Sequence, residues 1–292
     1  MFMVNDVIFS KVVLRPAGFN GFCCGIAFFG MKGMTEVSTK NTALFLRVIA
    51  TLAFVAMVVV NALANGLPIN GLTTGEVSDL YPNLFTPAGI TFSIWSVIYL
   101  FLFAFVINTW VRRDDVQITQ LLPAFVMTCI FNLTWIVVWH NLLPGLSVVI
   151  MLLLLGTLVL LFLRIQHTFQ RNKANIFLVS VPFSIYLAWI CVATIANISA
   201  WLVSFNADEF FISGEAWTLI MMTLAAGIGV LVLLKYQVPE FVAVIAWALT
   251  GIFLRWNGSD QMAIQYVSLG LVVALIAFTS FLLVRKNVHA SE

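Results

Sequence analysis

Long apolar stretches recur along the chain, and short polar connections separate them. A helix that crosses a bilayer needs about 20 mostly apolar residues. Eight stretches come close to or exceed this length, at about 43–64, 88–110, 119–139, 144–165, 175–203, 216–234, 239–254 and 262–284, and the seventh is the shortest. The pattern therefore predicts an all-α, polytopic transmembrane helical bundle of about eight spans.

The fifth stretch carries a second pattern inside its apolar run. Tyr186, Trp189, Ala193, Asn197 and Trp201 follow one another at steps of three or four residues, which places them on one face of an α-helix. A lipid-facing stripe would carry aliphatic side chains and Phe, so this face is predicted to point inward, toward neighbouring helices or a ligand. Helix packing alone is the alternative, because small residues and Asn join membrane helices without any ligand.

Two more spans show an aromatic face with a polar group. The positions are Phe92, Trp95, Tyr99 and Phe103 in the second span, and Asn132, Trp135 and Trp139 in the third. Aromatic walls with a few hydrogen-bonding groups suit a flat, mostly apolar ligand. Two alternatives stay open: the asparagines could serve interhelical hydrogen bonds, and tryptophans near span ends could belong to the interfacial belt.

The composition agrees with a membrane protein. Hydrophobic residues make up 62% of the chain and charged residues 9%, whereas soluble domains have about 25% charged residues. The net charge of +2 gives no reason to expect a nucleic-acid partner. The four cysteines lack metal-type spacing, so neither a metal site nor a structural disulfide is predicted.

Charged residues are scarce inside the spans. Glu240, at the edge of the seventh span, is the nearest carboxylate, and ion-coupled carriers usually keep one at mid-membrane. Arg47 is the one cation inside a span, and we expect its side chain to snorkel to the headgroups. No nucleotide loop, HExxH or GxSxG motif is present. A non-enzymatic protein with no required cofactor is predicted.

Basic residues alternate between connections. The second, fourth and sixth connections and the C-terminus carry Arg112, Arg113, Arg164, Arg171, Lys173, Lys235, Arg285 and Lys286, whereas the first, third and fifth have none. The positive-inside rule then predicts that both termini are cytoplasmic, and a bacterial inner membrane is the expected location. Residues 1–41 form a predicted N-terminal tail, whose first 33 residues are interpreted as an extension upstream of a start at Met34.

These motifs resemble the TspO/MBR family of translocator, or tryptophan-rich sensory, proteins. The fifth span follows the family pattern YLAWxxxATxxNxxxW from Tyr186 to Trp201 at every spacing. Asn132 with Trp135 repeats the family's NxxW, and Trp95 with Tyr99 repeats its WxxxY. The resemblance covers residues 42–204 as a five-helix unit and leaves residues 205–292 as a three-helix extension.

The resemblance implies a bundle that binds a flat hydrophobic ligand, with porphyrin or haem as the candidate tetrapyrrole, and acts as a sensor or carrier. The ligand-binding positions carried over are Trp95, Tyr99, Asn132, Trp135, Tyr186, Trp189, Ala193 and Asn197. The loop before the second span is about five residues shorter than the family's PxWxPPxW segment, and Gly89 stands where its last Trp would fall. An aromatic lid is therefore expected to be largely missing.

Other functions stay open at this point. A permease for a small lipophilic solute is compatible with eight spans and with Pro123 and Pro182 inside them. A non-catalytic partner subunit is a further alternative, in which the extra helices dock another membrane protein. The lipid bilayer and a small hydrophobic ligand are the expected partners, and the sequence does not distinguish a monomer from a homodimer.

Overall fold

The structure is a computed structural model that describes residues 25–67, 69–169, 176–205 and 212–290. These residues are helical or lie in turns and loops, and none forms a strand. Eight helical segments among them are long and apolar enough to cross a membrane. The predicted class, an all-α bundle of eight spans, is confirmed.

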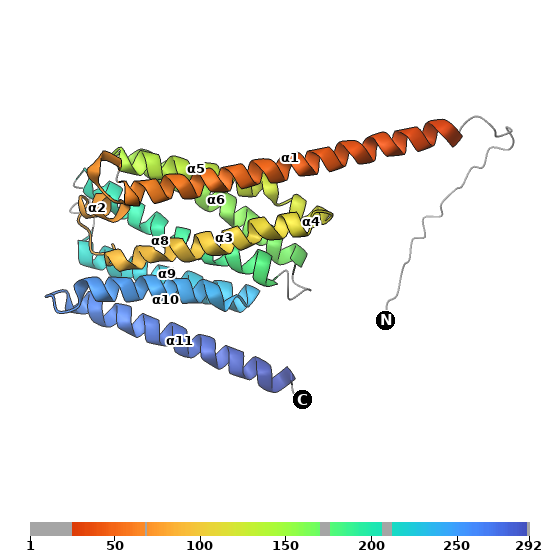
Figure 1. Cartoon of the computed structure of the whole chain (residues 1–292). Helices are drawn as coiled ribbons and strands as arrows, with labels where there is room; N and C mark the ends of the chain where they lie inside the picture. The colour runs from red at the N-terminus through yellow and green to blue at the C-terminus, as the bar shows by residue number, and fades with distance from the viewer. Residues whose placement is uncertain (1–24, 68, 170–175, 206–211, 291–292) are drawn as a thin grey trace, which may run out of the picture. The chain divides into compact units, whose positions relative to one another are not determined.

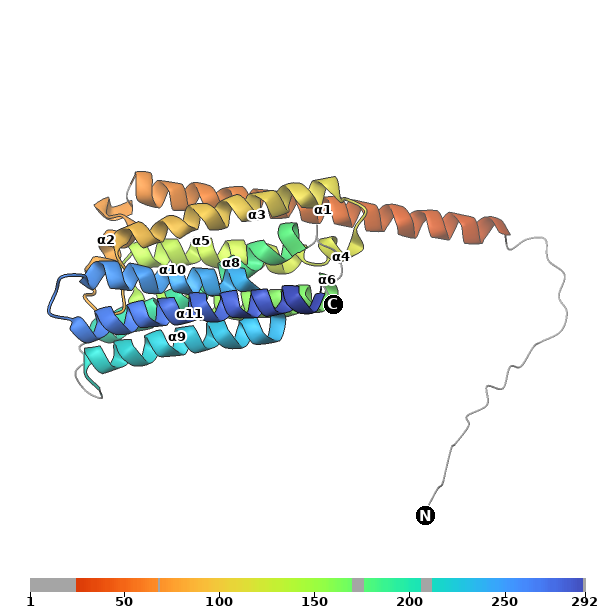
Figure 2. The same ribbon diagram turned by 90° about the horizontal axis from the view of Figure 1, so that it is seen from below.

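The bundle is built from long helices joined by short connections (Figures 1 and 2). In chain order the elements are α1 (Gly25–Gly66), η1 (Ile69–Gly71), α2 (Thr74–Asp79), η2 (Gly89–Ser93), α3 (Ile94–Val111), α4 (Val116–Thr119), α5 (Leu122–His140), α6 (Pro144–Phe169), η3 (Ile176–Ser180), α8 (Val181–Val203), α9 (Gly214–Tyr236), α10 (Pro239–Trp256) and α11 (Met262–Ala290). Here η1 and η2 are 3₁₀ turns and η3 is a π turn.

The chain divides into two compact units, residues 1–42 and residues 43–292. Of the predicted tail, residues 1–24 lie outside the described residues. Helix α1 already begins at Gly25, so the predicted boundary at residue 41 falls inside a helix. All packing described below concerns the second unit.

Both prolines that the sequence places within spans lie in the first turn of a helix. Pro123 follows Leu122, the first residue of α5, and Pro182 follows Val181, the first residue of α8. Proline lacks the N–H that a helix interior needs, but the first turn leaves that group unpaired in any case. The predicted fifth span is accordingly divided into the π turn η3 and α8. Pro123 thus lies in the first turn of α5, and Pro182 lies where the π turn η3 passes directly into α8.

Helix α8 lies at the centre of the bundle. It packs against α3, α6, α9 and α10, and 78% of its most apolar window is buried, compared with 22% for α1 and 11% for α11. Helix α10 packs in turn against α9 and α11, and both ribbon views show α10 beside α11 (Figures 1 and 2). The helix with the most complete aromatic motif is therefore the one enclosed on the most sides.

Arg47 does not snorkel, and this expectation was wrong. Its side chain is buried and donates hydrogen bonds to the carbonyl of Thr109 at 3.0 Å, to the carbonyl of Arg113 and to Oγ1 of Thr119 at 2.9 Å. The last carbonyls of a helix lack intrahelical partners and carry partial negative charge. The guanidinium of α1 therefore satisfies the C-terminal end of α3, which lies at the same depth.

Candidate ligand site

Trp95 of α3 lies at the centre of the aromatic residues that the sequence predicts to converge. Its ring centroid is 5.6 Å from that of Tyr99, 6.0 Å from Trp135, 6.1 Å from Tyr186 and 6.2 Å from Trp189. The pairs with Tyr99 and Trp135 are stacked, and the other two are edge-to-face, both of which are favourable ring geometries. Side chains from α3, α5 and α8 thus meet in one aromatic cluster.

Two further aromatic residues belong to this cluster, although they are not among the carried-over positions. Phe92 packs edge-to-face on Trp189 at 6.0 Å, and Trp139 stacks on Trp135 at 6.3 Å. Trp139 is 4% exposed and donates from Nε1 to the carbonyl of Thr74 at 3.3 Å, so it is not an interfacial belt residue. Phe92 lies three residues before Trp95, and Trp139 lies four residues after Trp135. This helical spacing is the sequence signal that could have added both to the predicted ligand-binding residues.

Asn132 joins three helices by hydrogen bonds. Its Oδ1 accepts from Nδ2 of Asn61 on α1 at 2.9 Å, and its Nδ2 donates to the hydroxyl of Tyr186 on α8 at 3.0 Å. Asn132 and Tyr186 are both fully buried. Asn61 was not predicted, because nothing in the sequence of α1 indicates which asparagine faces α5.

Asn197 has a similar role on α8. Its Oδ1 accepts from Nε1 of Trp135 at 3.2 Å and from the hydroxyl of Ser147, while its Nδ2 donates to the carbonyl of Ala193 at 3.1 Å. Both predicted polar groups therefore form interhelical hydrogen bonds, as the packing alternative expects. Their contact with a ligand stays a prediction.

Two other polar groups in the cluster have no internal partner. The indole Nε1 of Trp189 and the hydroxyl of Tyr99 are buried atoms without a hydrogen bond to any described residue. Buried polar groups are almost always paired, and an unpaired one costs about 1–3 kcal/mol. These two donors are therefore the groups of the cluster most suited to a ligand or to ordered water.

The cluster leaves little open space within it. The cavity beside Trp95, Trp135 and Trp189 has a volume of about 30 Å³, which is enough for one or two water molecules. Ala193 and Asn197 also line it. Small-molecule sites usually measure about 300–1,000 Å³, so a flat ligand does not fit here without movement of a ring.

A larger groove of about 380 Å³ lies on the other side of Trp95, between α1 and α3. Its lining residues are Val58, Asn61, Ala62, Asn65, Thr74, Phe92, Ser93, Trp95, Ser96 and Tyr99. Thr74, Phe92 and Trp95 line both the groove and the small cavity. The Trp95 ring therefore forms part of the wall between a ligand-sized groove and the aromatic cluster.

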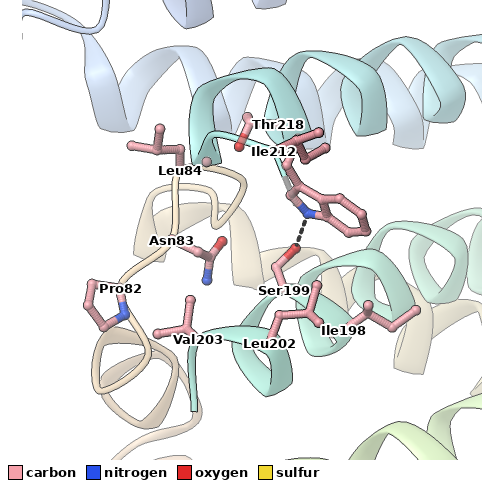
Figure 3. Close-up of a pocket in the computed structure, with 11 residues that line it drawn as sticks. Pro82, Asn83, Leu84, Ile198, Ser199, Leu202, Val203, Ile212 and Thr218 are labelled. Atoms are coloured by element: carbon pink, nitrogen blue, oxygen red, sulfur yellow. Dashed lines mark hydrogen bonds between the residues drawn. The ribbon is translucent and has the colours of Figure 1, made fainter. Parts of the chain in front are cut away.

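A separate cavity of about 450 Å³ lies at the start of α9 (Figure 3). Pro82, Asn83 and Leu84 border it from one side, and residues of α8 and α9 border it from the others. Trp217 Nε1 donates to Ser199 Oγ at 2.9 Å, the dashed line in Figure 3. No predicted ligand-binding residue lines this cavity.

The connection between α1 and α3 closes the cluster at one end. Thr73 and Glu76 form a capping box at the start of α2, with the Thr73 amide donating to Glu76 Oε2 at 2.7 Å. Hydrogen bonds from the backbone and side chain of Thr73 lower the pKa of Glu76. Tyr81 packs on Trp139 at 5.8 Å, and burial raises the pKa of Tyr81.

The described residues contain no group of three or more His, Cys, Asp or Glu side chains that could hold a metal ion. Cys129 and Cys191 are free thiols within the bundle. The remaining cysteines, Cys23 and Cys24, lie outside the described residues.

An eight-span bundle with an aromatic cluster at its centre defines an integral membrane protein. The model of the TSPO-like protein family matches residues 47–281, and the chain belongs to that family. The match includes α9, α10 and most of α11, the helices that the sequence motifs leave outside the resemblance. No curated protein and no solved structure matches the chain significantly.

Proposed function

We propose that this protein binds a flat hydrophobic ligand at the aromatic cluster and acts as a sensor or carrier, with a tetrapyrrole such as haem as the ligand to test. The convergence of Trp95, Trp135 and Trp189 from three helices is the observation that supports this proposal. Membership of the TSPO-like family agrees with it.

The ligand enters the cluster from the α1–α3 groove. The groove already has the volume of a small-molecule site, whereas the cavity inside the cluster does not. Rotation of the Trp95 side chain joins the two spaces, because that ring lines both. The Tyr99 hydroxyl and the Trp189 indole then donate hydrogen bonds to acceptors on the ligand, such as the carboxylates of a tetrapyrrole.

Titration of the purified protein with haem, followed by tryptophan fluorescence, tests this proposal. Trp189→Leu removes one wall and one unpaired donor, and its Kd is expected to rise about tenfold or more. Trp201→Leu is the matched control, because Trp201 lies on the same helix but is 40% exposed and lines neither space. No binding by the unaltered protein, or equal affinity in the Trp189 and Trp201 variants, rejects the site.

We place the protein in a bacterial inner membrane with both termini in the cytoplasm. Arg255, in the last turn of α10, is the basic residue next to a connection on the opposite side, and it pairs with Asp79 at 2.8 Å, which offsets its charge. A cysteine introduced at Asn141 should react with a membrane-impermeant maleimide from outside intact cells, and one introduced at Asp114 should not. The reverse labelling contradicts the orientation.

A further inference from the structure

One face of α10 is directed toward the connection that precedes α3. Trp247, Gly251 and Arg255 follow at steps of four residues, which places them on one side of the helix, and Trp256 comes next. All four contact residues between 79 and 93. We call these four residues of α10 the loop clamp, and residues 79–93 the closing segment.

Each contact of the loop clamp is a hydrogen bond or an ion pair. Trp247 Nε1 donates to the carbonyl of Thr91 at 2.9 Å, and Trp256 Nε1 donates to the carbonyl of Leu84 at 2.9 Å. Arg255 pairs with Asp79 at 2.8 Å. The closing segment has no tryptophan of its own, so both indoles that hold its backbone come from α10.

Gly251 brings the two backbones into direct contact. Its carbonyl accepts from the amide of Ala88 at 2.9 Å. A Cβ at position 251 would lie 2.0 Å from Thr91 Oγ1 and 2.7 Å from Thr91 Cγ2, which is closer than real Cβ contacts allow. Only glycine at this position lets the closing segment lie so close to α10.

The closing segment borders the spaces of the candidate site. Pro87 and Phe92 line the small cavity beside Trp189, and Phe92 and Ser93 line the α1–α3 groove. Within itself, the segment has a turn in which Asn83 Oδ1 accepts from the amides of Phe85 and Thr86. The three bonds to α10 from Leu84, Ala88 and Thr91 are therefore spread along the part that leads to the site.

We infer that the loop clamp of α10 fixes the closing segment over the aromatic cluster and thereby limits how fast ligand enters and leaves. The second half of this inference rests on the proposed function, whereas the first half does not. Helix α10 is thus a positioning element for a site to which it contributes no lining residue.

Hydrogen–deuterium exchange on the ligand-free protein in detergent tests the clamp itself. The amide of Ala88 should exchange slowly in the unaltered protein, because it is bonded to Gly251. Gly251→Ala should accelerate exchange of the Ala88 and Thr91 amides by about tenfold. Gly227→Ala on α9 is the matched control, since a Cβ there meets no atom within 4 Å. Equal exchange in the two alanine variants overturns the inference.

Trp247→Phe is the second variant for the exchange experiment, to be used if the Gly251→Ala protein does not fold. It retains an aromatic ring and removes the indole N–H that donates to the Thr91 carbonyl, so exchange of the closing segment should rise severalfold. Trp110→Phe is its control, because the Trp110 indole bonds to Thr51 of α1 near the C-terminal end of α3, away from residues 84–93. A folded Trp247→Phe protein with unchanged exchange in residues 84–93 also overturns the inference.

Release of bound haem to excess apomyoglobin tests the rate limit. Dissociation should be about three to ten times faster from the clamp variants than from the controls. Faster amide exchange with an unchanged haem dissociation rate contradicts the inference that the clamp limits ligand release. It still supports the inference that the clamp fixes the closing segment. If the unaltered protein binds no haem, the proposed function fails. The exchange experiment still tests whether the loop clamp fixes the closing segment.

Discussion

The two sets of polar groups in the aromatic cluster have different environments. Asn132 and Asn197 have their amide groups occupied by bonds to α1, α5, α6 and α8. Tyr99 and Trp189 bury donors that have no partner among the described residues. A polar residue on an inward face of a membrane helix can therefore link helices, as Asn132 and Asn197 do, or keep a donor free of any internal partner, as Tyr99 and Trp189 do. Residue type alone does not decide this.

Asn132→Leu should give the largest change in stability. It leaves the buried Asn61 amide and Tyr186 hydroxyl each short of one hydrogen bond, so the free energy of unfolding should fall by about 2 kcal/mol. Unfolding in mixed detergent, followed by circular dichroism, measures this. Asn141→Leu, at the C-cap of the same helix, is the control, because the Asn141 side chain is exposed and bonds to the carbonyl of Val137 one turn earlier. If both variants are equally stable, the proposed linking role of Asn132 is wrong.

Two tyrosine variants compare the paired and the unpaired group directly. Tyr186→Phe removes the acceptor of Asn132 and should lower the free energy of unfolding by about 1 kcal/mol. Tyr99→Phe removes a hydroxyl without an internal partner, so stability should be retained or rise.

Affinity for haem should respond in the opposite way. Tyr99→Phe should weaken binding by about fivefold, the equivalent of one hydrogen bond, and Tyr186→Phe should change it less. A Tyr99→Phe protein that loses stability but keeps its affinity reverses the two roles. Isothermal titration together with thermal unfolding provides both quantities.

The capping box of α2 should give the smallest effect, and one that depends on pH. The pKa of Glu76 is lowered in the folded protein, so its stabilising contribution is complete above the ordinary value of 4.5. It is lost as the pH falls through the lowered, folded-state value. The amide resonance of Thr73 should shift over that acidic range. Glu76→Gln should abolish the shift, and a shift that persists in this variant assigns it to another group.

The span pattern predicted most of the fold because bilayer crossing imposes one length and one composition on each helix. Helical spacing also predicted that Trp95, Trp135 and Trp189 face inward, and the structure brings them together. The sequence pattern did not predict that the Arg47 side chain is buried, because its burial depends on where α3 ends. Nor did it predict the loop clamp, whose partners are separated from it by 156 to 176 positions.

The sequence motifs also did not show which polar side chains of the candidate site already have hydrogen-bond partners. Asn132 and Asn197 were expected to contact ligand, yet their amides are occupied by residues on other helices, including Asn61 and Ser147. Pairing of this kind is a property of three-dimensional neighbours. The unpaired donors of Tyr99 and Trp189 became visible only after those neighbours were placed.

The indole N–H resonances of ¹⁵N-labelled tryptophans, recorded with and without haem, show whether the unpaired Trp189 donor binds the ligand. The Trp189 indole has no internal acceptor, so its proton should move downfield when a ligand supplies one. The Trp135 indole is already bonded to Asn197 and should shift much less. Zinc protoporphyrin replaces haem where paramagnetism broadens the signals. A large shift at Trp135 with none at Trp189 would contradict the account.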